Sequence, residues 1–202
     1  MRGTFYWYVT HSAFNNYRSV PTVTTQALSG TFANGSLIEF SKFRVAASDA
    51  GKIDLNKVTI GLTWSTSTSD SLSVGSFKFY RGPISSSIAS VSPSVVTPGV
   101  DSIAVIFTNS KEIGAGEYFN YTLKGVATGF GKTTTGVPDV LSLQVLGDAA
   151  PIDSATSGAP LIAAKNFVWS DESSLGHSLS TADWTGGYLV NSLPLDTQSR
   201  SW

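Results

Sequence analysis

Cysteine is absent from the 202 residues, which excludes disulfide bonds, thiolate nucleophiles, iron–sulfur clusters and thiolate zinc sites. Charge is also scarce, because Asp, Glu, Lys and Arg together make up only 13% of the chain, about half the usual share. The net charge is -1 and no basic stripe is present, so nucleic acid is not an expected partner. No run of 18 or more apolar residues occurs, so we expect no membrane-spanning helix.

Apolar residues, in contrast, make up 41% of the chain, which is enough for one sizeable core. Ser and Thr fill about a quarter of it, and this predicts a neutral, hydroxyl-rich surface. Such a surface is typical of secreted and surface β-proteins, so we expect an extracellular or cell-surface location. Met1 and Arg2 lead directly into "GTFYWYV" without an apolar signal region, which we interpret as a mature product or a fragment of a longer protein.

Period-2 alternation recurs along the chain and predicts β-strands. "KVTIGLTWS", residues 57–65, is one clear example, and Gly- and Pro-bearing turns separate it from similar runs. We expect eight to ten strands, essentially no helix, and a two-sheet β-sandwich. A β-bulge near Ser41–Lys42 would explain why apolar residues change face there. The predicted core consists of Val58, Ile60, Leu62, Phe77, Phe79, Ile103, Val105, Phe107, Tyr121, Leu123, Leu143 and Val145.

The pattern divides the chain into residues 1–29, an aromatic strand and connector, residues 30–147, the sandwich, and residues 148–202, a linker followed by a closure segment. The first strand is bulky on both faces, which is an aggregation hazard unless both faces are covered. Either this strand is central in its own sandwich or it lies against another subunit, and we favour a subunit contact through Phe5, Tyr6, Trp7 and Tyr8.

No set of residues spells out an enzyme. Asp171 and Glu172 are sequence neighbours and face opposite ways on a strand, so with Asp183 they are expected to be surface turn or capping residues. His177 and His11 are the two histidines, but no G-x-S-x-G elbow accompanies them. "GFGKTTTG" lacks the spacing of a phosphate-binding loop. We therefore predict a non-enzymatic protein.

Two ligand sites remain open at this point. Bound calcium is the single cofactor that the loops suggest, through Asp49, Asp54 and Asp153, although no EF-hand spacing is present. A sugar-stacking platform is the other, through Trp169, Trp184 and Tyr188.

The most specific stretch is "NFVWSDESSLGHSLSTADWTGGYLVNSL", residues 166–193, which we call the closure motif. With the following Pro194 it resembles the C-terminal segment of large secreted proteins from uncultivated, Patescibacteria-type candidate-phylum bacteria. Upstream, residues 39–65 and 113–129 also resemble the immunoglobulin-like β-sandwich that precedes this motif, with a jelly roll as the alternative topology, and the resemblance as a whole covers roughly residues 30–195. The resemblance implies a cell-surface location and a structural or adhesive role, and it transfers no catalytic residue.

Two functions follow as hypotheses. The first is an extracellular structural, assembly or adhesive domain that self-associates as a filament or surface layer, or is part of a larger surface protein. The alternative is a carbohydrate-binding module that uses exposed aromatics on a glycan. Under the first hypothesis Trp169 and Trp184 are buried, and His177 is hydrogen-bonded locally rather than lining an open cleft.

Overall fold

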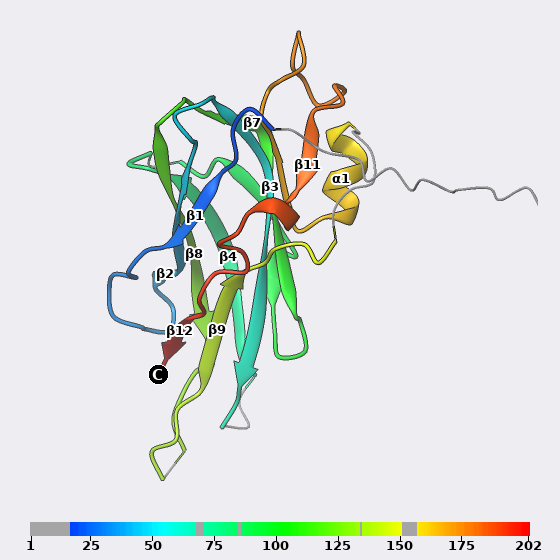
Figure 1. Cartoon of the computed structure of the whole chain (residues 1–202). Coiled ribbons are helices and arrows are strands. Elements are labelled where there is room, and N and C mark those ends of the chain that lie inside the picture. The colour runs from blue at the N-terminus through cyan, green and yellow to red at the C-terminus, as the bar shows by residue number, and fades with distance from the viewer. Residues whose placement is uncertain (1–16, 68–70, 85, 134, 151–156) are drawn as a thin grey trace, which may run out of the picture.

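A computed structural model describes residues 17–67, 71–84, 86–133, 135–150 and 157–202, and these form two antiparallel sheets (Figure 1). In spatial order, the first sheet contains β1 (Thr22–Thr25), β2 (Leu37–Ala46), β8 (Tyr118–Thr128), β4 (Ser73–Arg81) and β6 (Val95–Val96). The second contains β11 (Trp184–Gly186), β10 (Phe167–Ser170), β3 (Ile53–Ser65), β7 (Ser102–Ile113) and β5 (Ala89–Ser92). Two further strands extend the second sheet, since β9 (Val140–Val145) pairs with β3 and β12 (Gln198–Ser201) pairs with β9.

The core lies between the sheets, where alternate side chains of each strand meet. The prediction of an all-β, two-sheet sandwich is therefore confirmed. Every predicted core residue is buried except Phe77, which is partly buried. The exception has a local cause, because the register of β4 shifts between Gly75 and Lys78, and Ser76 has a positive φ of 53°.

The predicted bulge in β2 is present, with the register shifting between Glu39 and Ser41. Phe40 and Phe43 both reach the core on either side of it. The side-chain oxygen of Gln198, on β12, accepts hydrogen bonds from the Lys42 backbone N–H at 2.8 Å and the Ser41 hydroxyl at 3.1 Å. The Gln198 side chain thus supplies an acceptor to one backbone N–H and one hydroxyl next to the bulge.

Two strands share one edge of the long strand β3. β9 pairs with its residues 60–65, and β10 pairs with its residues 54–58. At the junction, the Thr59 carbonyl accepts a bond from the Leu146 N–H, and the Thr59 N–H donates to the Asn166 carbonyl. β9 and β10 therefore act as one interrupted strand, and the chain between them leaves the sheet and returns.

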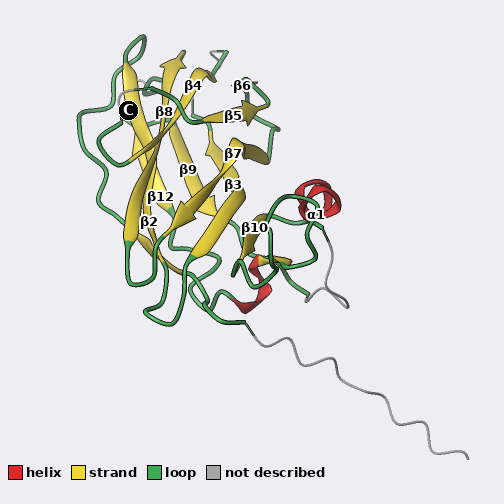
Figure 2. Cartoon of the chain, turned by 90° about the horizontal axis from the view of Figure 1, so that it is seen from above, coloured by secondary structure: helices red, strands yellow, loops and turns green. Residues whose placement is uncertain are grey.

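That excursion carries a feature that the alternation did not predict, the seven-residue helix α1 (Gly158–Ala164). A short 3₁₀ turn, η1 (Gly187–Leu189), follows β11. In the view from above, α1 lies at one side of the sandwich, next to β10 (Figure 2). None of the helices in the described part of the chain is long and apolar enough to cross a membrane.

Candidate functional site

The closure motif, residues 166–193, is built into the end of the second sheet. In β10, Phe167 and Trp169 point into the main core, while Val168 faces the other way and packs with Leu161 of α1 and Trp184 of β11. The sequence F-V-W-S is apolar on both faces because α1 covers the face that would otherwise meet water. The motif thus completes the sandwich.

Both tryptophans of the motif are buried, as predicted for a structural closure. Trp169 has no exposed surface, and its indole N–H donates to the Gly186 carbonyl at 3.0 Å. Trp184 is 1% exposed, and its N–H donates to the Ser178 carbonyl at 2.8 Å. Each ring therefore has the apolar surroundings and the single acceptor that a buried tryptophan needs.

This burial overturns the sugar platform that was predicted from the same residues. Neither Trp169 nor Trp184 offers a face to a sugar ring, because their rings lie within the protein. Tyr188 is 48% exposed, but neither tryptophan of the predicted platform is exposed beside it.

His177 lies in the loop between β10 and β11 and joins that loop to β3. Its Nδ1 atom is 2.9 Å from an Asp183 carboxylate oxygen, and its Nε2 atom is 3.1 Å from Oδ2 of Asp54. Its ring also packs against Trp184, with 5.0 Å between the centroids. The predicted local bond is present, and the bond to Asp54 adds a tie across the fold.

The Asp183 carboxylate accepts several hydrogen bonds from residues of the same loop. Besides His177, its carboxylate accepts bonds from the Thr181 hydroxyl at 2.6 Å and the Ser174 backbone N–H at 3.2 Å. Burial acts to raise the pKa of Asp183, but the bonds from Thr181, Ser174 and His177 outweigh it and leave the pKa below its usual value. The side chain is therefore held as a carboxylate beneath the loop.

Asp171, Glu172 and Asp183 were predicted at the surface, and this placement is wrong for all three, since only 1% of the Asp183 side chain is exposed. Asp171 is buried, and it accepts bonds from the backbone N–H groups of Ser173, within its own turn, and of Arg18. Only 6% of the Glu172 side chain is exposed, and its Oε2 atom lies 2.6 Å from Lys52. The turn role is correct, but the start of the described chain covers this turn.

That covering segment is tied firmly to the closure motif. Tyr17 packs against Trp169 with 5.2 Å between ring centroids, and its hydroxyl donates to the Thr185 hydroxyl. The Arg18 guanidinium donates to the carbonyls of Asp171 and Glu172. Sequence reasoning missed Tyr17, Arg18 and Lys52, because their partners lie far away along the chain.

Two of the three calcium candidates lie in the described part of the chain, in different surroundings. Asp54 is buried beside His177, whereas Asp49 is exposed in the turn before β3. Asp153 lies outside the described residues, as do Phe5, Tyr6, Trp7 and Tyr8, the predicted assembly residues.

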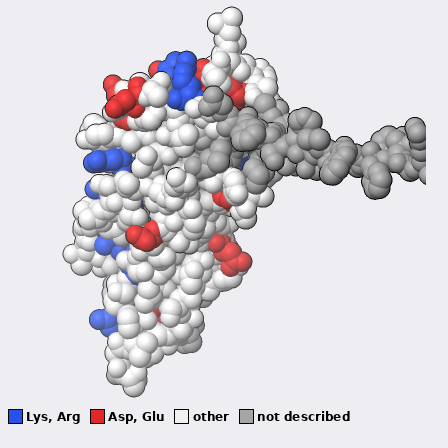
Figure 3. All heavy atoms as spheres, in the orientation of Figure 1, with Lys and Arg blue, Asp and Glu red and all other residues white. Residues whose placement is uncertain are grey.

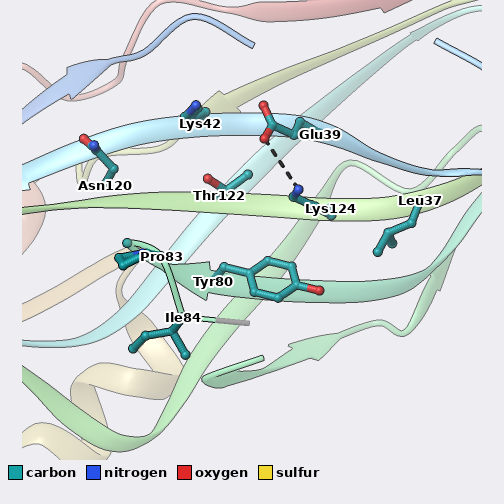
Figure 4. Close-up of a pocket in the computed structure, with 10 residues that line it drawn as sticks. Leu37, Glu39, Lys42, Tyr80, Pro83, Ile84, Asn120, Thr122 and Lys124 are labelled. Atoms are coloured by element: carbon teal, nitrogen blue, oxygen red, sulfur yellow. Dashed lines mark ion pairs between the residues drawn. The ribbon is translucent and has the colours of Figure 1, made fainter. Parts of the chain in front are cut away.

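An open groove of about 580 Å³ lies on the outer face of the first sheet, on β2, β8 and β4. Figure 4 shows Tyr80 and Ile84 along one side, with the Lys124–Glu39 ion pair, 3.6 Å long, across from them. Leu37, Lys42, Pro83, Asn120 and Thr122 also line it. The groove thus combines one tyrosine ring with amide, hydroxyl and charged groups, a lining that suits a polar ligand with apolar faces.

Neither the closure motif nor the groove on the first sheet has the geometry of a catalytic triad. Among the described residues, the side-chain partners of the His177 ring are Asp183, Asp54 and, at 3.4 Å, the Thr181 hydroxyl, on the same nitrogen that faces Asp183. A serine triad needs the second ring nitrogen beside a hydroxyl, whereas here it faces a carboxylate.

No model of a known protein family matches the chain, and no curated protein matches it in sequence.

Proposed function

We propose that the chain is a non-enzymatic, extracellular structural domain that assembles with further copies of itself through residues 3–11. The observation that carries this proposal is the anchorage of Tyr17 and Arg18 on the closure motif. At most five residues separate that anchor from the aromatic segment, so the anchor limits where the segment can reach. A strand with two apolar faces gains most by adding to a second sandwich.

The polar chemistry of the closure motif supports a structural role. Within the motif Asp183 bonds to His177, His177 also bonds to Asp54 of β3, and the buried Asp171 bonds to Arg18 at the start of the described chain. Figure 3 shows that charged side chains are sparse on the viewed face and leave wide uncharged areas between them. A surface with little charge repulsion is compatible with close packing of copies.

Deleting residues 1–12 tests the proposal. We expect the full chain to associate with rising concentration, and the shortened chain to remain a folded monomer, measured by light scattering and circular dichroism. A shortened chain that unfolds would assign the segment to its own core, and a full chain that stays monomeric at every concentration would refute assembly. A matched pair of variants, Phe5→Ser with Trp7→Ser and Tyr6→Ser with Tyr8→Ser, tells which face makes the contact.

The groove of Figure 4 favours a second function, adhesion to a glycan. Tyr80 supplies a ring for a sugar face, and Asn120 and Thr122 supply hydrogen-bonding groups. A glycan array tests it, with Tyr80→Ala expected to abolish the signal. Tyr118→Ala is the control, because Tyr118 is exposed on the same sheet but does not line the groove.

A further inference from the structure

Three side chains have the arrangement of metal ligands where β3 meets the loop between β10 and β11, which we call the closure loop. Asp54, Glu172 and His177 each present one donor atom, and the three atoms lie within 4.8 Å of one another. They come from β3 and from two points of the loop between β10 and β11, so one ion would join the loop to the sheet. The His177 Nε2 atom and Asp54 Oδ2, at 3.1 Å, are close enough for both to reach one ion at about 2.0–2.2 Å.

Glu172 supplies a second and independent observation. Its side chain is more than nine-tenths buried, with Oε2 bound to Lys52. Its other oxygen, Oε1, is also buried, and it has no hydrogen-bond partner among the described residues. A buried carboxylate oxygen without a partner is costly, and a cation removes that cost. The positive φ of Glu172, 50°, holds this side chain in a backbone conformation that few residues adopt.

Asp183 has the role of an orienting partner. It bonds to Nδ1 of His177, so that Nδ1 can keep its proton when the lone pair of Nε2, which lies beside Asp54, binds the ion. A carboxylate behind a ligating histidine is the common outer shell of protein metal sites, where it fixes the ring and raises its basicity. The same Asp183 is itself fixed by Thr181 and Ser174.

We propose that Asp54, Glu172 and His177 bind one divalent transition-metal ion of the zinc type, with Asp183 as a positioning residue. Imidazole nitrogen and carboxylate oxygen both suit zinc, whereas calcium takes oxygen ligands. The ion replaces the direct hydrogen bond between His177 and Asp54 and pins the closure loop to β3. This site differs from the calcium site predicted from Asp49, Asp54 and Asp153, and it stands whether or not copies of the chain assemble.

Calorimetric titration and thermal melting of the full chain, after treatment with a chelator, test the site with zinc, manganese and calcium salts. We expect one zinc ion per chain, and a rise in Tm of about 5–10 °C at a hundredfold excess over Kd. Calcium should produce no comparable shift. Failure of zinc and manganese to bind would overturn the proposal, and tighter binding of calcium than of zinc would overturn the metal type.

Variants identify the ligands. Glu172→Gln and His177→Gln should lose zinc binding, and Asp183→Asn should weaken it about 10–100-fold while keeping one ion per chain. Glu112→Gln is the matched comparison, because Glu112 also binds Lys52 but is outside the ligand set; it lies near Glu172 and His177, so its affinity can change, but it should still bind one zinc ion per chain. Unchanged binding in Glu172→Gln would refute the site.

A measurement that needs no ligand variant guards against misfolding. In His11→Gln, His177 is the single histidine, so its ring nitrogens can be followed by NMR as zinc is added. We expect the Nε2 resonance to shift and Nδ1 to remain protonated. Loss of zinc binding in His11→Gln, or a shift at Nδ1 alone, would overturn the assignment.

Discussion

Replacing Trp184 with alanine tests whether the closure motif stabilises the sandwich. The side chain is 1% exposed and packs with Leu161, Val168 and the His177 ring. Burying a tryptophan removes roughly 150–250 Å² from water, and at about 25 cal/mol per Å² this is worth about 4–6 kcal/mol as an upper limit. Alanine retains a part of that burial, so we expect a loss of about 3–5 kcal/mol.

Urea unfolding followed by tryptophan fluorescence and circular dichroism measures this loss, and Tm should fall by about 6–20 °C. Tyr188→Ala is the control, because Tyr188 lies in the same motif but is 48% exposed, and it should change stability by less than about 0.5 kcal/mol. If Trp184→Ala melts like the unmodified chain, the motif is not part of the cooperative fold. If Trp184→Ala has an unchanged Tm but no longer binds glycans, the structural interpretation of the motif is wrong.

Three further changes test other contacts. Asp148→Ala removes the acceptor of the Asn166 and Gly187 backbone N–H groups and should cost about 3 kcal/mol in urea unfolding, whereas the exposed Asp196→Ala should cost almost nothing. Gln198→Ala leaves the β2 bulge without its acceptor and should cost about 1–2 kcal/mol, with faster amide exchange at Lys42 as the specific sign. Glu39→Gln tests pH dependence: burial acts to raise the pKa of Glu39, but the Ser29 N–H, Lys42 and Lys124 outweigh it and lower the pKa. A lowered pKa stabilises the fold above the unfolded pKa of 4.5 and loses that effect as pH falls through the folded pKa, so Glu39→Gln should be less stable than the unmodified chain at pH 7 and equal to it well below pH 4.

The strands could be predicted from the sequence because their signal is local. Alternation with a period of two fixes which side chains share a face, and in β3 it correctly placed Val58, Ile60 and Leu62 inside. The bulge in β2 was predictable for the same reason, since one extra residue reverses the phase of the alternation. The burial of Trp169 and Trp184 followed from their size and from the acceptors around them. The resemblance to immunoglobulin-like modules, the cell-surface location and the subunit contact through the first strand stay predictions.

The cluster beneath the closure loop was decided by tertiary structure alone. Asp54 and His177 are 123 positions apart, and Arg18 and Asp171 are 153 positions apart, so no periodicity links them. Asp54 and His177 meet because Ser170, at the end of β10, pairs with Asp54 near the start of β3, so the loop that follows β10 lies beside Asp54. Adjacent carboxylates such as Asp171 and Glu172 look like surface residues in a sequence, since isolated charges avoid burial. Only the fold brings Arg18 and Lys52 next to them, and the bonds to these partners offset the free-energy cost of burying the two carboxylates.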